Sequence, residues 1–329
     1  MGLPAPELVT LDVAPGAALE SQSGLQQLRP RIFGALHRAE GPRRVAAIVM
    51  HPTSNFMGHY LLQPLAARGV TCLGLNSRYA GNDTLPGGEP AGLSPQDLPP
   101  VQGLALCAAH EGRSHLMRHW IDPSVFDEDD PLSANFDLDM YDERNGPPYA
   151  PAFLERYRAA QLARLERIET WVRERLALLR RLKLPGAPRD QVFVIHRTHA
   201  DPRFLDLALD ANDRAVGSVW AAGAQGARAV NAAASQMGRV TSLAAFLSQW
   251  SPSSRADGPA NLARTRVPVL LHTYTADQST FPSTRDAWLA AGGDRIRNVD
   301  VRGGTHYLAG QPDLLAQVAD EMAQWMRAL

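Results

Sequence analysis

The sequence predicts an α/β fold: a mostly parallel sheet flanked by helices, with an α-rich cap inserted into it. Short continuous runs of aliphatic residues occur in both halves of the chain, as at 44–50 and 267–272. Such runs are typical of strands that are buried on both faces of a parallel sheet. At least one pair of these strands is separated by a segment with helical character, which is long enough for a crossover connection.

Residues 1–110 are expected to form the N-terminal part of the core. The expected strands are Leu8–Val13, Arg31–His37, Arg44–Met50, Val70–Leu75 and Val101–Ala108. A helix at Gly58–Arg68, closed by Gly69, is expected to connect the third strand to the fourth. Residues 84–100 are rich in proline and glycine, so regular structure is not expected there.

Residues 111–260 are expected to form the inserted cap. Its clearest element is a long amphipathic helix, residues 151–184 (Pro151–Leu184), whose apolar residues fall at helical spacing opposite a face rich in Arg and Glu. We expect this apolar stripe to cover the core or the cap interior, and the alternative is that it pairs with the same helix in a homodimer. A strand is expected at Gln191–Ile195, and helices within the Ala- and Gly-rich stretch Ala221–Trp250.

Residues 261–329 are expected to return to the core. The expected elements are a strand at 267–272, a helix at Ser283–Ala291 and a strand at Arg295–Val301. Asp277 lies in the turn after the first of these strands, and His306 follows Gly303-Gly304 after the second. Two glycines allow a loop to approach closely and to aim the imidazole ring at the edge of the sheet.

This order of strand, acid, helix, strand and Gly-Gly-x-His resembles the way an α/β-hydrolase presents the acid and then the base of its triad. The resemblance implies that His306 is the general base and that Asp277 fixes its tautomer and stabilises the imidazolium. An ordinary acidic loop residue and loop histidine are the alternative. The resemblance covers residues 1–108 and 265–329, and nothing in the cap is transferred by motif.

Two further segments carry the resemblance. His51-Pro52 sits where the family places its His-Gly oxyanion loop, and 65–70 followed by 76–82 looks like the passage that ends in its Arg-x-x-Gly loop. Because Pro52 has no N–H, the backbone of Thr53 or Ser54 would have to donate to the oxyanion. A plain strand-to-helix connection, with Ser54 or Asn55 capping the helix, is the alternative.

The nucleophile of the triad has no counterpart in the sequence, because no Gly-x-Ser-x-Gly pentapeptide occurs in it. Between the loop at Asn82 and the strand at Val101 the family inserts a module that needs roughly 50 residues. Either this module is deleted, or the complete chain contains a segment that this sequence lacks. A deletion would leave unpaired backbone groups and apolar faces in water, which favours the second alternative. The loop serines that could replace the nucleophile are Ser54, Ser77, Ser94 and Ser114, and we assign none of them.

Further residues are expected to line the substrate site or were considered as metal ligands. His110 and Arg113 follow a core strand, and we expect them, with His51, to contact substrate; a structural role is the alternative. The acidic stretch 127–142 lacks the spacing of a calcium loop, so we expect a solvated loop. His115 and His119 lie four residues apart but have no evident third ligand, so no metal site is expected.

Composition excludes several classes of partner. The formal net charge of −1 and a pI near 6.8 give no electrostatic case for binding nucleic acid or an anionic membrane. From the N-terminal residues we expect no signal peptide, and no apolar run of about 20 residues occurs in the sequence. Cys72 and Cys107 lie in strand-like runs and are expected to be free thiols in a reducing compartment. We therefore expect a cytoplasmic protein.

The resemblance implies hydrolysis of an ester, thioester or similar acyl bond in a small-molecule substrate, through a covalent acyl-enzyme. No cofactor is implied, because this chemistry needs only side chains and backbone donors. The alternative is a hydrolase-like binding or scaffold protein that lacks its nucleophile. A lyase or a dehalogenase on the same fold would also need the elbow residue.

Overall fold

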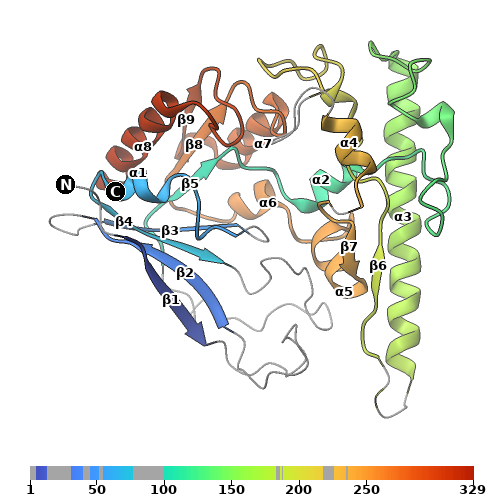
Figure 1. Cartoon of the computed structure of the whole chain (residues 1–329), viewed down its shortest axis with the longest axis horizontal. Helices are drawn as coiled ribbons and strands as arrows, with labels where there is room; N and C mark the ends of the chain where they lie inside the picture. Colours follow the sequence, from blue (N-terminus) through green and yellow to red (C-terminus); the bar gives the residue numbers. More distant parts are fainter. Residues whose placement is uncertain are drawn as a thin grey trace. The chain divides into compact units, whose positions relative to one another are not determined.

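The computed structural model describes residues 5–12, 31–39, 45–51, 55–76, 100–182, 186, 188–217, 226–234 and 236–329. The chain forms two compact units, one of Met1–Asp83 with Gly310–Leu329 and one of Thr84–Ala309 (Figure 1). The predicted division into a core of 1–110 and 261–329 and a cap of 111–260 stays a prediction.

The first unit contains a four-stranded sheet in the order β1-β2-β4-β3. Its strands are β1 (Glu7–Asp12), β2 (Arg31–His37), β3 (Val45–His51) and β4 (Val70–Asn76). The β1–β2 and β2–β4 pairs are antiparallel, and the β3–β4 pair is parallel. These four strands were predicted, with ends that differ by one residue. Helix α8 (Pro312–Arg327) belongs to the same unit.

The connection between β3 and β4 is less helical than the sequence predicted. Helix α1 spans only Leu62–Ala66, and turns lie on both sides of it. The prediction of a helix over Gly58–Arg68 is wrong because of Pro64, which has no N–H and whose ring would clash with a helical carbonyl four residues earlier. The helix can therefore start only within the turn that contains Pro64. Gly69, with φ +85°, ends the segment as predicted.

The second unit is built around a three-stranded parallel sheet in the order β5-β8-β9. The strands are β5 (Leu104–Cys107), β8 (Val269–Tyr274) and β9 (Ile296–Val301). Strand β8 begins two residues later than predicted, at the point where the Pro268 carbonyl accepts from Leu104 N. Buried Val269 and Leu271 pack with Leu262 and Trp288 in one apolar cluster.

Helices make up most of the remaining part of this unit. They are α2 (Arg113–Trp120), α3 (Pro151–Arg181), α4 (Gly226–Ala232), α5 (Leu243–Ala245), α6 (Gly258–Leu262) and α7 (Pro282–Gly292), with short 3₁₀ turns η3 (Phe136–Leu138), η4 (Pro202–Phe204) and η6 (Gly293–Arg295) and a π-helical turn η5 (Phe246–Trp250). A two-stranded antiparallel sheet joins β6 (Val192–Val194) to β7 (Val240–Ser242). Helix α2 and the π-helical turn were not predicted.

The long helix α3 begins at Pro151, as predicted, and ends at Arg181. Its apolar stripe, which includes Leu165, Ile168 and Val172, is buried in a cluster with residues of α2, α5 and η5. The prediction that the stripe covers an interior is therefore confirmed, whereas pairing in a homodimer stays a prediction. No described helix, α3 included, is long and apolar enough to cross a membrane.

Strands β3 and β5 each have a hydrogen-bonded neighbour on one side only, within the described part of the chain. Strand β4 pairs with β2 and β3, and β5 pairs with β8, so β4 and β5 are not hydrogen-bonded neighbours in the described residues. The prediction that β3 is buried on both faces is wrong. Its residues alternate between partly buried and exposed, and Ile48 and Met50 are 63% and 55% exposed.

We expect truncation of a buried side chain of β8 to lower the stability of the protein. Because Leu271 is 3% exposed and packs against Trp288, Leu271→Ala should lower the free energy of unfolding by about 2–5 kcal/mol. Leu178→Ala, on the exposed side of α3, is the control and should change it by less than about 0.5 kcal/mol. Urea unfolding followed by circular dichroism measures both, and equal losses would contradict the prediction.

Candidate functional site

The acidic residue of the site lies in the loop after β8. Asp277 is fully buried, and its carboxylate is held by the loop that it begins. Oδ1 accepts from the backbone N–H groups of Ser279 at 2.7 Å and Thr280 at 3.0 Å, and Oδ2 accepts from the Thr280 hydroxyl at 2.6 Å. Three donors from two residues, Ser279 and Thr280, therefore fix the direction in which the carboxylate faces.

The histidine lies in the loop after β9. Backbone hydrogen bonds join this loop to the loop after β8 that carries Asp277. Thr275 N donates to Val301 O at 3.1 Å, and Ala276 N donates to Gly304 O at 3.0 Å. Gly303 has φ +69°, a conformation that favours glycine, and a Cβ on Gly304 would lie 3.1 Å from atoms of Val301. Glycine is therefore favoured at both positions, by the backbone conformation at Gly303 and by the tight contact at Gly304.

Asp277 and His306 form a hydrogen-bonded pair. His306 Nδ1 lies 2.9 Å from Oδ2 and 3.1 Å from Oδ1 of Asp277. Because an ionised carboxylate only accepts, Nδ1 carries the proton and donates it, which leaves Nε2 as the basic nitrogen. The side chain of His306 is 12% exposed and that of Asp277 is 0% exposed. This is the arrangement that orients a general base.

The charge of Asp277 is stabilised by its neighbours. Burial opposes its ionisation, but His306 and the hydrogen bonds from Thr280 outweigh burial and hold the pKa of Asp277 below its ordinary value. The carboxylate is therefore ionised at neutral pH and able to stabilise an imidazolium.

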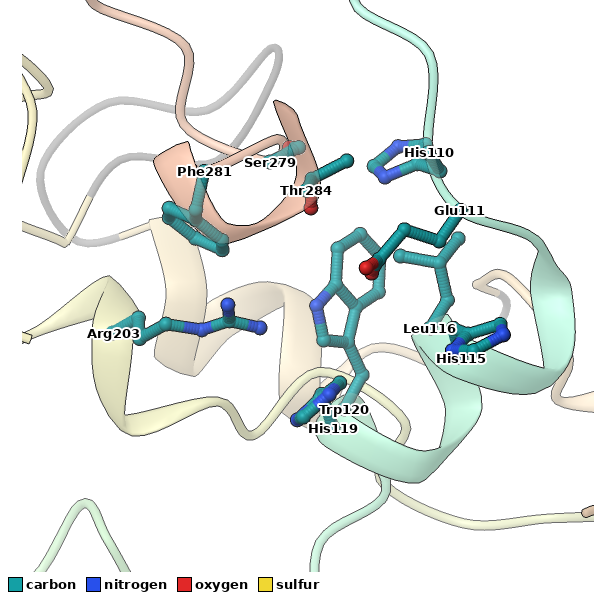
Figure 2. Close-up of a pocket in the computed structure, with 10 residues that line it drawn as sticks. All are labelled: His110, Glu111, His115, Leu116, His119, Trp120, Arg203, Ser279, Phe281 and Thr284. Carbon is teal, nitrogen blue, oxygen red and sulfur yellow. The ribbon is translucent and has the colours of Figure 1, made fainter. Parts of the chain in front are cut away.

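A small cavity lies between α2 and the start of α7 (Figure 2). It is lined from three segments: α2 with the loop before it, η4, and the first turn of α7 with the loop before it. The lining residues are His110, Glu111, His115, Leu116, His119, Trp120, Arg203, Ser279, Phe281 and Thr284. With about 10 Å³ it is too small for an organic substrate, because substrate pockets measure roughly 300 Å³ or more.

Burial shifts the titration of two residues on this cavity. Burial lowers the pKa of His119 to about 4, so its ring is neutral at neutral pH. Burial raises the pKa of the Glu111 carboxyl, although His115 and Arg203 oppose this. Ser279 Oγ and His119 Nδ1 are buried without a hydrogen-bond partner in the part of the chain that the structure describes.

The residues expected to line a substrate site lie in different surroundings. His110 lies beside the pair, with its ring centroid 5.6 Å from that of His306 and 5.7 Å from a ring of Trp120. Arg113 is 7% exposed, and its guanidinium packs over Trp250 at 4.9 Å instead of lining the cavity. His51 belongs to the first unit, where its ring stacks on Phe56, so its predicted role stays a prediction.

The oxyanion donors predicted at Thr53 and Ser54 lie outside the described residues, as do the candidate serines 77 and 94. The remaining candidate, Ser114, is 6% exposed and donates its hydroxyl to Ala256 O at 3.1 Å. That hydroxyl is engaged in packing α2 against the residues before α6. No hydroxyl or thiol in the described ranges is hydrogen-bonded to the His306 ring.

The acidic stretch 127–142 forms turns and ion pairs. Glu128 accepts from Arg164 through two bonds of 2.7 and 2.6 Å, and Arg164 is fully buried. Several of the aspartates accept from backbone N–H groups two residues later, as Asp129 N donates to Asp127 Oδ1 at 2.9 Å. Among the described residues, no group of three His, Cys, Asp or Glu is arranged to hold a metal ion.

Sequence reasoning did not identify Arg203, Ser279 or Phe281 as part of the site. Ser279 and Phe281 follow Asp277 closely, so the position of the acid was a signal that pointed to them. Arg203 had no such signal, because it belongs to a segment without a periodic pattern and reaches the site only through the fold.

Comparison with solved structures finds chains of similar length and low sequence identity. The esterase domain of a Rhodothermus marinus protein is 13% identical (TM-score 0.40), with 98% of both chains covered. A soluble variant of monoglyceride lipase from Saccharomyces cerevisiae is 11% identical (TM-score 0.44), with 99% of this chain and 97% of that chain covered. A Paleococcus ferrophilus monoacylglycerol lipase is 11% identical (TM-score 0.40), with 90% and 98% covered. No family model and no curated protein matches the sequence.

The predicted fold is confirmed at the level of architecture. Each of the two units contains a sheet with parallel strand pairs, and in the second unit the acid follows β8 and the histidine follows β9. This agrees with the predicted α/β class, and the similarities above are too low to carry information on the reaction.

The pKa of Asp277 predicts how stability depends on pH. Because the folded pKa is lowered, the stabilisation is complete above about pH 4 and is lost as the pH falls through the folded value. Asp277→Asn should therefore lower the free energy of unfolding at pH 7 by about 1.5–3 kcal/mol and make it less dependent on pH below 5.

Denaturant unfolding between pH 3 and 7 measures this dependence. Asp313→Asn, which removes an exposed carboxylate from the first turn of α8, is the control for loss of surface charge. If Asp277→Asn keeps the acid dependence of the wild type, the predicted lowering of the Asp277 pKa is wrong.

Proposed function

We propose that this chain is the part of a serine hydrolase that carries the base and the acid of the triad. The complete enzyme would cleave an ester, thioester or similar acyl bond of a small molecule through an acyl-enzyme. The observation that carries the proposal is the Asp277–His306 pair, a buried carboxylate 2.9 Å from a histidine ring nitrogen, with each residue in a loop after a parallel strand. Functional groups of α/β folds gather at this end of parallel strands.

In the proposed reaction, Nε2 of His306 takes the proton of a serine hydroxyl as that oxygen attacks the acyl carbon. Asp277 stabilises the resulting imidazolium, and His306 then returns the proton to the leaving group. Water hydrolyses the acyl-enzyme in the same manner, with His306 again acting as the base. Backbone N–H groups after β3, at Thr53 or Ser54, are proposed to stabilise the oxyanion.

The nucleophile is proposed to lie in a segment that this sequence lacks between β4 and β5. The open edges of β3 and β5 support this, because each is a strand with parallel pairing on one side only, among the described residues. A strand that ends in an elbow serine would satisfy backbone groups of such an edge. The exposed Ile48 and Met50 of β3 are the apolar face that the helices of such a segment would cover.

We also propose a cytoplasmic location. Cys72 and Cys107 are free thiols, and burial raises the pKa of both to about 12, which keeps them protonated and unreactive. Free thiols are typical of a reducing compartment.

Mass spectrometry of the protein from its natural source, before and after treatment with a fluorophosphonate probe, tests the proposal. We expect a mass that exceeds 35.8 kDa by roughly 50 residues and a single added probe. A mass that agrees with the sequence, with no labelling, would favour the alternative of a binding or scaffold protein without a nucleophile.

Removal of the base gives a second test. His306→Ala should lower the rate of probe labelling and of p-nitrophenyl ester hydrolysis by about 10⁴-fold or more, because the serine then has no proton acceptor. His196→Ala, in the segment after β6 of the same unit, is the matched control and should retain the wild-type rates. Unchanged labelling of His306→Ala would rule out His306 as the base.

A further inference from the structure

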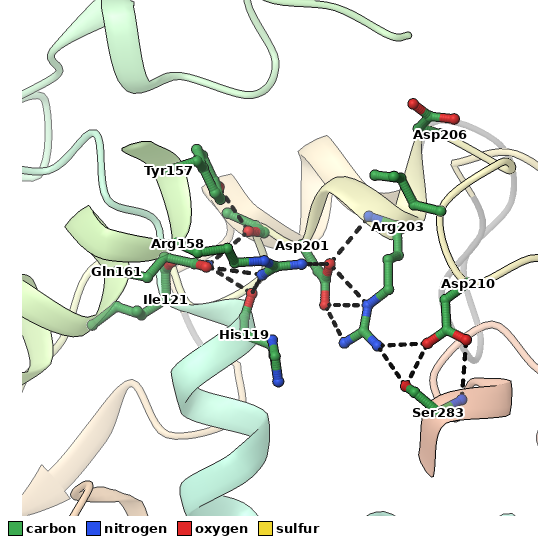
Figure 3. Close-up of polar contacts among 12 residues, drawn as sticks. His119, Ile121, Tyr157, Arg158, Gln161, Asp201, Arg203, Asp206, Asp210 and Ser283 are labelled. Atoms are coloured by element: carbon green, nitrogen blue, oxygen red, sulfur yellow. Dashed lines mark hydrogen bonds and ion pairs between the residues drawn. The ribbon is translucent and has the colours of Figure 1, made fainter. Parts of the chain in front are cut away.

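Asp201 is a fully buried carboxylate between α3 and η4 (Figure 3). Its Oδ1 accepts from Arg158 Nη2 at 2.8 Å, and its Oδ2 accepts from Arg203 Nη2 at 2.7 Å and Nε at 3.0 Å. Burial opposes the charge, but the two guanidinium groups outweigh it and hold the pKa of Asp201 well below its ordinary value. The carboxylate therefore anchors Arg203 to helix α3.

Arg203 makes a second set of contacts at the start of α7. Its Nη1 donates to Asp210 Oδ2 at 3.0 Å and to Ser283 Oγ at 3.3 Å. Its guanidinium also lies over the ring of Phe281, with Cζ 4.1 Å from the centroid. Only a planar group with several donors makes these contacts at once, so lysine is a poor substitute at this position.

Asp210 completes the attachment of α7. Its Oδ1 accepts from Ser283 N at 3.0 Å, and its Oδ2 accepts from the Ser283 hydroxyl. Ser283 is the second residue of α7, where backbone N–H groups have no partner inside the helix and a negative charge is favourable. The beginning of α7 is thus fixed by a residue outside the loop that carries Asp277.

The segment that supplies Arg203 and Asp210 is itself braced by Arg214. The Arg214 guanidinium donates to the carbonyl oxygens of Arg203, Asp206, Leu209 and Asp210, at 2.9, 3.0, 2.7 and 2.9 Å. It also lies 5.0 Å from the centroid of the Phe281 ring. Because four of its carbonyl oxygens accept from one side chain, the segment of residues 203–214 holds in place the residues that contact α7.

We infer that Arg203 is a positioning residue for Asp277: it ties the loop of residues 277–283 to helix α3 and so sets where the carboxylate meets His306. The loop is short and is held at both ends, by the bonds that Asp277 accepts and by the contacts of Phe281 and Ser283 with Arg203 and Asp210. A shift of the second end moves the first. The inference rests on the proposed function in taking Asp277 and His306 as a catalytic pair.

The NMR signal of the proton on His306 Nδ1 reports the position of the Asp277 carboxylate directly. This measurement does not require an active enzyme. In the wild type we expect a downfield imidazole N–H resonance in the proton NMR spectrum, assigned by its loss in His306→Ala. Arg203→Lys should shift this resonance upfield or broaden it beyond detection, because the hydrogen bond to Asp277 lengthens. A merely structural loss of stability would not move it.

Arg164→Lys is the matched control. Arg164 is also buried in the same unit and forms a two-bond pair with a carboxylate, Glu128, but it makes no contact with the Asp277 loop. We expect this variant to keep the wild-type resonance even where it lowers the melting temperature. An equal shift in both variants would overturn the inference, since the effect would then be general.

An unchanged resonance in Arg203→Lys would also overturn the inference. If that variant does not fold, Asp210→Asn combined with Ser283→Ala tests the same attachment at less buried positions, and an unchanged resonance there has the same meaning. A wild type without the resonance overturns it too, because there is then no pair to position. Failure of the proposed function is distinct: the resonance would be present, but no nucleophile would be labelled.

Discussion

The burial of one negative charge organises the candidate site. A carboxylate removed from water is costly unless donors surround it, and Asp277 has its donors from Ser279, Thr280 and His306. The same requirement fixes the loop that follows β8, the ring of His306 and the glycines that bring the β9 loop close. The geometry of the Asp277–His306 pair therefore follows from the hydrogen bonds that the buried charge requires.

Buried charges also join helix α3 to other segments of the second unit. Asp201 and Asp210 balance Arg158 and Arg203 in one network, and Glu128 balances Arg164 in another. Pairs of this kind are retained at little net gain in stability, because desolvation offsets most of their attraction. Their directional bonds instead define which surfaces meet. In this unit they define how α3 faces the start of α7.

Sequence reasoning succeeded where a local rule decides the structure. Local patterns of this kind are the aliphatic runs of β4 and β8 and the apolar stripe of α3. The pair Gly303-Gly304 likewise predicted that the loop of His306 approaches closely. It failed at the helix before β4, where Pro64 was overlooked, and at β3, because an aliphatic run says nothing about whether another element covers it. The role of Arg203 could not be predicted from the sequence, because its partners come from α3 and α7, which are distant along the chain.

The edges of β3 and β5 have a consequence for how this chain behaves in solution. Each presents a row of backbone groups without a strand beside it, within the described ranges, and β3 adds the exposed side chains of Ile48 and Met50. Such edges are templates on which strands of other molecules add, and they lead to aggregation and to retention by chaperones. Any strand that pairs with these edges would therefore also remove the sites at which strands of other molecules add.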